Sequence, residues 1–290
     1  MRFSRVGTIF LVLTTVLIGA NCSYYNQIIA RKNLVDGGKA YKNRKFQEAE
    51  QLFRDAIRRD PSGENVEGRT AQLFLARTLH SIYIGNRSDT AKAEEAIGEY
   101  KKVLSKDIAD NSSFKAVANL LENLNKEDEW LKWITDRTTD EKVPREQRAE
   151  ALTSLAAKQY TCANDISDAE SVKKEITKDG KPAYQFLKPQ NPADLEQLKQ
   201  CVQKGSEFID KAAELDPNSD SVWSYKANML IQRMRIAEME GNNELKEKLK
   251  ADAEKAKERF TELAKIKKDK ADAEEAERKA KEEAANKNKK

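Results

Sequence analysis

The sequence has few of the residues that sheet-rich proteins depend on. Its 290 residues include only 6 prolines and 11 glycines, and 7% of them are aromatic. Sandwiches and barrels need many turn formers, and no run here alternates Val, Ile, Thr or Tyr with polar residues. We therefore expect a chain without a β-sheet.

The residues of common catalytic sites are also missing. His80 is the only histidine, which excludes a His-rich metal site and a zinc protease signature. No nucleophilic serine motif and no glycine-rich phosphate loop is present. Pairs of carboxylates remain as a conceivable catalytic device, but among 49 acidic residues their proximity in sequence carries no information. We expect a protein that is not an enzyme and needs neither cofactor nor metal.

Charge is abundant but mixed in sign. The chain has 53 basic and 49 acidic residues and a net charge of +4. A nucleic-acid binder would concentrate its cations to displace counterions from phosphates. Here both signs are interspersed along segments rich in Ala, Glu, Lys, Leu and Gln, which favour helices. We expect no nucleic-acid partner and an all-α chain with charged, solvent-exposed helix faces.

Residues 1–22 have the features of a secretory leader. Arg2 and Arg5 precede an apolar run from Val6 to Ala20. This run is shorter than the roughly 20 residues that a helix needs to cross a bilayer. A cleaved signal is favoured over a permanent span, and either places the rest of the chain outside the cytoplasm.

The end of the leader, Leu17-Ile18-Gly19-Ala20-Asn21-Cys22, resembles a bacterial lipoprotein signal. The resemblance assigns Cys22 as the lipid attachment residue. Asn21 departs from the Gly, Ala or Ser that such signals carry before the cysteine. An uncleaved signal anchor and ordinary secretion are the alternatives, and the expected location is the periplasmic side of the cell envelope, anchored to a membrane.

The two remaining cysteines, Cys162 and Cys201, then form an even pair in an oxidising compartment. We expect a disulfide between them. The alternative is a pair of buried, reduced thiols.

The clearest internal pattern lies between Gly37 and Pro61. Ala49, Phe53 and Ala56 share one helix face, where small residues allow a neighbouring helix to approach and the phenylalanine fills the gap. The segment AYKNRKFQEAEQLFRDAIRRDP resembles a tetratricopeptide repeat, a helix-turn-helix unit whose second helix has an Ala-x3-Phe pattern and closes on proline. The resemblance implies a right-handed superhelix, or α-solenoid, of helix pairs.

Weaker copies of the pattern occur further along the chain. Second helices are indicated at Ala96 and Tyr100, at Gly205 to Ala213, and at Ala256 and Phe260. Ala49 and Ala96 are 47 residues apart, whereas the family unit has about 34, so the units are irregular. We expect four or five of them within residues 23–265.

Two segments depart from the helical pattern. Periodicity fails over about 163–191, where Asp179-Gly180-Lys181-Pro182 predicts a turn and Asn191-Pro192 the start of the next helix. Cys162 and Cys201 flank this insertion. Residues 266–290 contain mainly Lys, Glu and Ala and predict a charged tail that is a frayed helix or disordered, with a nucleic-acid or membrane-surface role as a weaker alternative.

The resemblance also implies where partners bind. In the family, first helices line a concave surface through positions one, four and five after their small residue. Carried onto Gly37, Ala76, Ala118, Ala156 and Ala227, this gives the candidate partner-binding residues Tyr41, Lys42, Arg77, His80, Asn119, Tyr160, Asn228 and Gln232.

Three functions are compatible with this pattern. The first is an envelope-anchored scaffold that binds protein or peptide partners, by analogy with repeat lipoproteins that help to assemble outer-membrane barrels or pili. The second is a passive tether or spacer without a peptide groove. The third, an envelope hydrolase, has almost no support in the residues.

Overall fold

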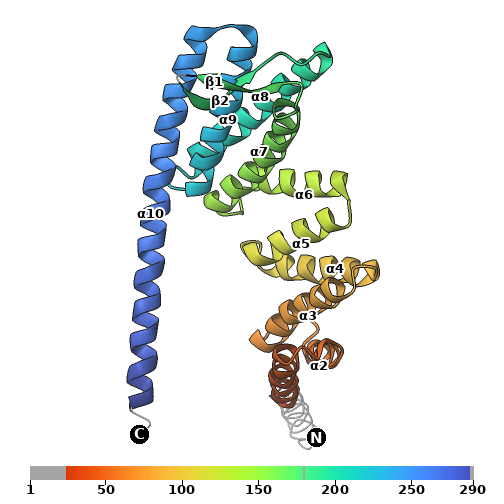
Figure 1. The fold of residues 1–290 in the computed structure, drawn as a ribbon. Coiled ribbons are helices and arrows are strands. Elements are labelled where there is room, and N and C mark those ends of the chain that lie inside the picture. The colour runs from red at the N-terminus through yellow and green to blue at the C-terminus, as the bar shows by residue number, and fades with distance from the viewer. Residues whose placement is uncertain (1–23, 179, 288–290) are drawn as a thin grey trace, which may run out of the picture. The chain divides into compact units, whose positions relative to one another are not determined.

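A computed structural model describes residues 24–178 and 180–287 (Figure 1). The chain divides into two compact units, residues 1–130 and residues 131–290. We call them the N-terminal unit and the C-terminal unit and describe each by itself. Residues 1–22, with Cys22, lie outside the described residues.

The N-terminal unit is a run of helices that each pack on the next along the chain. Residues 24–42 are helical and are followed by α2 (Phe46–Arg59), α3 (Val66–Gly85), α4 (Thr90–Lys106) and α5 (Asn111–Asn123). Contacts join α2 to α3, α3 to α4 and α4 to α5. Asp89 and Asp110 cap α4 and α5, because their carboxylates accept hydrogen bonds from the backbone N–H groups of Lys92 and Ser113.

The C-terminal unit is built from longer helices. Helix α6 (Glu127–Thr139) leads into it from the N-terminal unit, and α7 (Arg145–Ser167), α8 (Pro192–Leu215), α9 (Asp220–Glu240) and α10 (Asn243–Lys287) follow. Helix α9 contacts α7, α8 and α10. The predicted all-α fold of irregular helix pairs is confirmed.

The contact between helices at Phe53 is the one that the sequence pattern predicted. Ala49, Phe53 and Ala56 are completely buried on one face of α2. The backbone of Gly37 approaches so closely that a Cβ atom there would lie 2.7 Å from Cε1 of the Phe53 ring. Gly37 is therefore required by close packing, since even one added methyl group would force the ring or the helix to move.

The same device recurs in the C-terminal unit. Ile209 and Ala212 of α8 are buried in one cluster with Val222 and Met229 of α9. At Gly205 a Cβ atom would overlap the side chain of Met229. The copy of the pattern at Gly205 to Ala213 thus also lies at a helix–helix contact.

The insertion forms a β-hairpin, so the expectation of no sheet is wrong. Strands β1 (Lys173–Lys178) and β2 (Lys181–Phe186) pair antiparallel. The turn predicted at Asp179-Gly180-Lys181-Pro182 joins the two strands. Asp-Gly is typical of two-residue hairpin turns, and Gly180 has the positive φ of 77° that such turns need. Pro182 is tolerated because both strands of a two-stranded ribbon are edges.

The hairpin is held by a small apolar cluster beneath it. Val172 and Phe186 are buried together with Leu198 and Val202 of α8 and Met239 of α9. Helix α7 continues to Ser167, so the irregular segment covers 168–191 rather than 163–191. Helix α8 begins where Asn191-Pro192 predicted, with the Asn191 side chain accepting a hydrogen bond from the Ala193 N–H at 3.1 Å.

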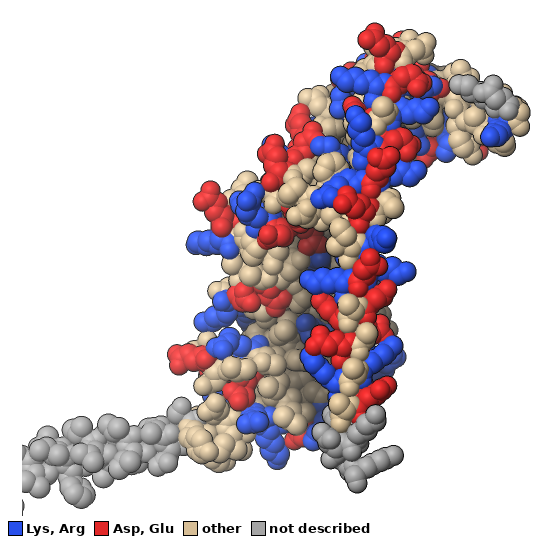
Figure 2. Space-filling view, turned by 90° about the vertical axis from the view of Figure 1, so that its left-hand side faces the viewer, with Lys and Arg blue, Asp and Glu red and all other residues tan. Residues whose placement is uncertain are grey.

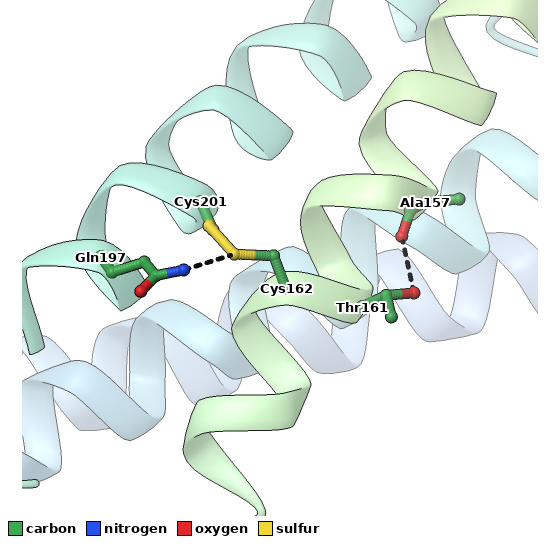
Figure 3. Close-up of a disulfide and its surroundings, with 5 residues drawn as sticks. All are labelled: Ala157, Thr161, Cys162, Gln197 and Cys201. Atoms are coloured by element: carbon green, nitrogen blue, oxygen red, sulfur yellow. Dashed lines mark hydrogen bonds between the residues drawn. A yellow bond between two sulfur atoms is a disulfide. The ribbon is translucent and has the colours of Figure 1, made fainter. Parts of the chain in front are cut away.

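Cys162 of α7 and Cys201 of α8 form a disulfide at the base of this excursion, with their Cα atoms 6.2 Å apart (Figure 3). Gln197 Nε2 donates to Cys162 Sγ at 4.0 Å. The bond closes a loop between residues 39 positions apart. In the chain-entropy model such a link contributes about 4 kcal/mol to the free energy of unfolding, chiefly by restricting the unfolded chain.

The charged tail continues α10 as a helix. Every side chain from Lys265 to Ala284 is exposed. Ion pairs at a spacing of four residues support it, Lys279 with Glu275 at 2.7 Å and Lys281 with Glu277 at 2.6 Å. Each pair is worth only about 0.2–0.5 kcal/mol, so this part of α10 depends on intrinsic propensity more than on tertiary contacts.

Candidate partner-binding surface

The most developed candidate surface lies in the N-terminal unit around Phe74 of α3. The ring of Tyr41, from the helix at residues 24–42, meets the Phe74 ring edge-on with centroids 5.9 Å apart. The Arg77 guanidinium lies 5.5 Å from the centre of the same ring. The hydroxyls of Tyr41 and Ser81 are hydrogen-bonded at 3.3 Å. We call Tyr41, Phe74, Arg77 and Ser81 the Phe74 cluster.

The cluster is formed by first helices, as the sequence pattern required. Arg77 Nη2 also reaches Ser112 Oγ of α5, the next first helix, at 3.5 Å. Side chains from three first helices are thus linked through Tyr41 and Arg77. Phe74 itself was not among the candidates, although its position three residues before Arg77 places it on the same helix face.

His80 lies beside the cluster and is more buried than a surface residue. Its Nδ1 is 3.5 Å from the Tyr100 hydroxyl, and the two rings meet edge-on. Its Nε2 is buried without a hydrogen-bond partner among the described residues. Burial, and then the nearby charge of Arg87, lower the pKa of His80, so the imidazole is neutral near pH 7. Burial also raises the pKa of Tyr100.

The other candidates are more dispersed. Lys42 and Asn119 are exposed, but the Asn119 side-chain oxygen accepts a hydrogen bond from Asn123 Nδ2 at 2.9 Å. In the C-terminal unit, Tyr160 meets Tyr225 edge-on with ring centroids 6.2 Å apart. Asn228 is half-buried on α9. None of these forms a cluster comparable to that around Phe74 within the described residues.

Gln232 is not a surface residue, and its assignment to partner binding is wrong. Its exposed fraction is 0%. Its Oε1 accepts from Ser167 Oγ at 3.0 Å and its Nε2 donates to Asn164 Oδ1 at 3.3 Å. Both partners belong to α7, so Gln232 satisfies the polar groups at the end of that helix.

Arg235 extends the same polar network towards the hairpin. It donates to Ser167 Oγ at 2.7 Å, pairs with Asp168 at 3.4 Å, and stacks 4.5 Å from the centre of the Phe186 ring. Helix α9 therefore fixes the end of α7 and the hairpin together.

Two pockets lie away from the predicted residues. One, of about 460 Å³, is bounded by the C-terminal ends of α2 and α4 and the first half of α3, and includes Ile57, Arg69 and Val103. The other, of about 400 Å³, lies among α8, α9 and α10. Among the described residues no group of three or more His, Cys, Asp or Glu is placed to hold a metal ion.

Charges are mixed on the face seen in Figure 2, where blue and red side chains are interspersed. Some form networks between second helices, as with Glu50 of α2, which accepts from Lys92 of α4 at 2.8 Å and from Arg54 at 2.8 Å. Burial acts to raise the pKa of Glu95 in this network, but hydrogen bonds from Arg54 and Lys92 outweigh it and lower the pKa. Within the described residues, no helix combines the length and the apolar character needed to cross a membrane.

No protein-family model and no curated protein matches the sequence. Solved structures with a similar arrangement of helices include that of PilF from Pseudomonas aeruginosa, at 13% identity and a TM-score of 0.37, covering 83% of this chain and 99% of that one. MamA from Desulfovibrio magneticus RS-1 gives 13% identity and a TM-score of 0.35, over 83% and 96% of the two chains. A tetratricopeptide repeat protein from Parabacteroides merdae gives 12% and 0.35, over 82% and 98%. These likenesses are distant and carry no information on what this chain binds.

The burial of His80 predicts a specific pH dependence of stability. Because the folded state lowers the pKa of His80 below its ordinary value of 6.5, the folded state is favoured fully above that value and loses stability as the pH falls below it. We expect the denaturant midpoint to fall between about pH 7.5 and about pH 5.5, and to fall less in His80→Gln. Carboxylates contribute equally to the pH dependence of both proteins, and His80 is the only histidine, so the difference between the proteins reports His80 alone. Equal falls of the two denaturant midpoints would contradict the prediction.

Proposed function

We propose that this protein is an exported, membrane-anchored scaffold of a bacterial envelope that binds protein or peptide partners through the Phe74 cluster and works without catalysis. The observation that supports this most is the convergence of Tyr41 and Arg77, from two first helices, on Phe74. Tyrosine and arginine are enriched where binding energy concentrates in protein interfaces.

The geometry of the cluster suits a peptide ligand. Arg77 is already oriented by Phe74 and Ser112, so binding would cost it less conformational entropy than a free side chain. Its guanidinium can donate to a carboxylate or a backbone carbonyl. Lys42, exposed on the helix that carries Tyr41, adds a second cation for an acidic segment.

The proposed location draws on two features. The leader at residues 1–22 directs export, and Cys22 offers a lipid attachment point. The Cys162–Cys201 disulfide is of a kind that persists in oxidising compartments such as the periplasm. A scaffold that is anchored to a membrane and exposed to the periplasm is compatible with the leader and with the disulfide.

A passive tether is the second candidate, and α10 favours it. Its exposed stretch from Lys265 to Ala284 has the composition of a spacer and makes few contacts with the body of its own unit. Lys267 is an exception, since its Nζ pairs with Asp220 at 3.0 Å. A tether needs no specific contact at the Phe74 cluster. Substitutions in the cluster therefore distinguish a tether from a scaffold.

Charge reversal at the cluster should remove a partner. We expect the full-length protein, purified from detergent-solubilised membranes, to retain a specific protein that is lost in Lys42→Glu/Arg77→Glu. The control Arg58→Glu/Lys101→Glu changes the net charge equally on α2 and α4 and should retain it. Quantitative mass spectrometry of the eluates measures the loss. A partner profile that is the same for all three proteins would favour the tether.

Lipid attachment at Cys22 has its own test. Metabolic labelling with a fatty acid should mark the protein, and Cys22→Ala should abolish the label and move the protein to a different cell fraction. Unlabelled wild-type protein that still sediments with membranes would instead indicate a signal anchor.

A further inference from the structure

The helix at residues 24–42 carries an exposed apolar face that nothing in the described structure covers. Tyr24 is 67% exposed, Tyr25 59%, Ile28 49% and Val35 49%. Tyr24, Ile28 and Val35 are spaced by four and seven residues, so they lie on one side of the helix. The opposite side, with Ala30, Gly37 and Ala40, is buried. The end faces of stacked repeats are normally polar. The exposed apolar face of this helix therefore indicates a surface that binds another molecule.

The charges beside this face are positive. Residues 24–42 contain four cations, Arg31, Lys32, Lys39 and Lys42, and a single acid, Asp36. Lys39 Nζ pairs with Asp36 at 3.3 Å. Arg31 and Lys32, one turn after Ile28, form no ion pair with any described residue. A helix with exposed Tyr and Ile flanked by unpaired cations has the composition of one that lies in a membrane interface.

We propose that the exposed face formed by Tyr24, Tyr25, Ile28, Arg31, Lys32 and Val35 lies on the surface of an anionic lipid bilayer. The position in the chain supports lipid as the occupant, because Tyr24 follows Cys22 and the apolar run from Val6 to Ala20 almost directly. The described helical residues therefore follow the proposed anchor closely in the sequence. Tyrosine side chains prefer the depth of the headgroups, and Arg31 and Lys32 would meet anionic phosphates.

A second copy of the chain fits this face less well. A two-fold contact would bring the same patch of both copies together, and with it Arg31 and Lys32 of both copies, which are like charges. Lipid phosphates would neutralise those charges instead. The inference rests on the membrane anchoring in the proposed function but not on the Phe74 cluster.

Photo-crosslinking to lipid tests the orientation directly. The full-length protein, with benzoylphenylalanine replacing Tyr24, Ile28 or Val35 in turn, is reconstituted in vesicles of phosphatidylcholine and alkyne-tagged phosphatidylglycerol. Matched controls carry the same group at Tyr184 or Ile84, which are 56% and 54% exposed on other elements. We expect tagged-lipid adducts at positions 24, 28 and 35 and background levels at 84 and 184. Arg31→Gln/Lys32→Gln should reduce the adducts at position 35 several-fold.

The contrary outcomes are distinct. Adducts confined to position 24 would show that the helix points away from the bilayer, and dimeric protein adducts at 28 and 35 would identify a second copy as the occupant. Protein that does not float with the vesicles would overturn the anchoring as well as this inference. Protein that floats but yields no lipid adducts at 28 and 35 would overturn this inference alone and leave the anchoring and the scaffold role in place.

Discussion

Helices can pair closely in this protein because small residues stand where their backbones meet. Gly37 faces the ring of Phe53, which is completely buried together with Ala49 and Ala56. A glycine and two alanines leave a gap of the size that one phenylalanine fills, which is how a helix pair without a large core of its own reaches the packing density of a protein interior. The register of the helix at residues 24–42 on α2 follows from this contact, and with it the position of Tyr41 relative to Phe74 of α3.

In the C-terminal unit a second set of constraints fixes the longer helices. The Cys162–Cys201 disulfide joins α7 to α8, and the network of Gln232, Arg235 and Ser167 joins α7 to α9. A buried amide that satisfies both its donor and its acceptor within the fold is rigid, because an alternative arrangement would leave polar groups unpaired. The hairpin is therefore part of this unit rather than a loose insertion, with Phe186 held between the apolar cluster and Arg235.

The helix pairs could be predicted from the sequence because their pattern is local. Ala49, Phe53 and Ala56 recur at helical spacing, and Asn191-Pro192 combines a capping side chain with a residue suited to a first turn. The sequence did not predict the hairpin because its strands lack alternating apolar residues. Phe186 is the strand residue that packs into the apolar cluster and holds the hairpin in place. Gln232 was misplaced because the family pattern gives its helix position but cannot show that Ser167 and Asn164 reach it from α7. Phe74 was overlooked for a related reason, as its importance depends on Tyr41, a residue on another helix.

The close approach at Gly37 can be measured by a double-mutant cycle with Phe53. Gly37→Ala should lower the free energy of unfolding by about 1–3 kcal/mol, because the added methyl group overlaps the Phe53 ring. Gly38→Ala, where nothing lies within 4 Å of the new methyl group, should instead be neutral or raise it by up to about 1 kcal/mol through helix propensity. In a Phe53→Leu background the cost of Gly37→Ala should shrink, since the ring that it strikes is gone. A cost of Gly37→Ala that is the same in both backgrounds, or an effect no different from that of Gly38→Ala, would contradict the packing described for this protein.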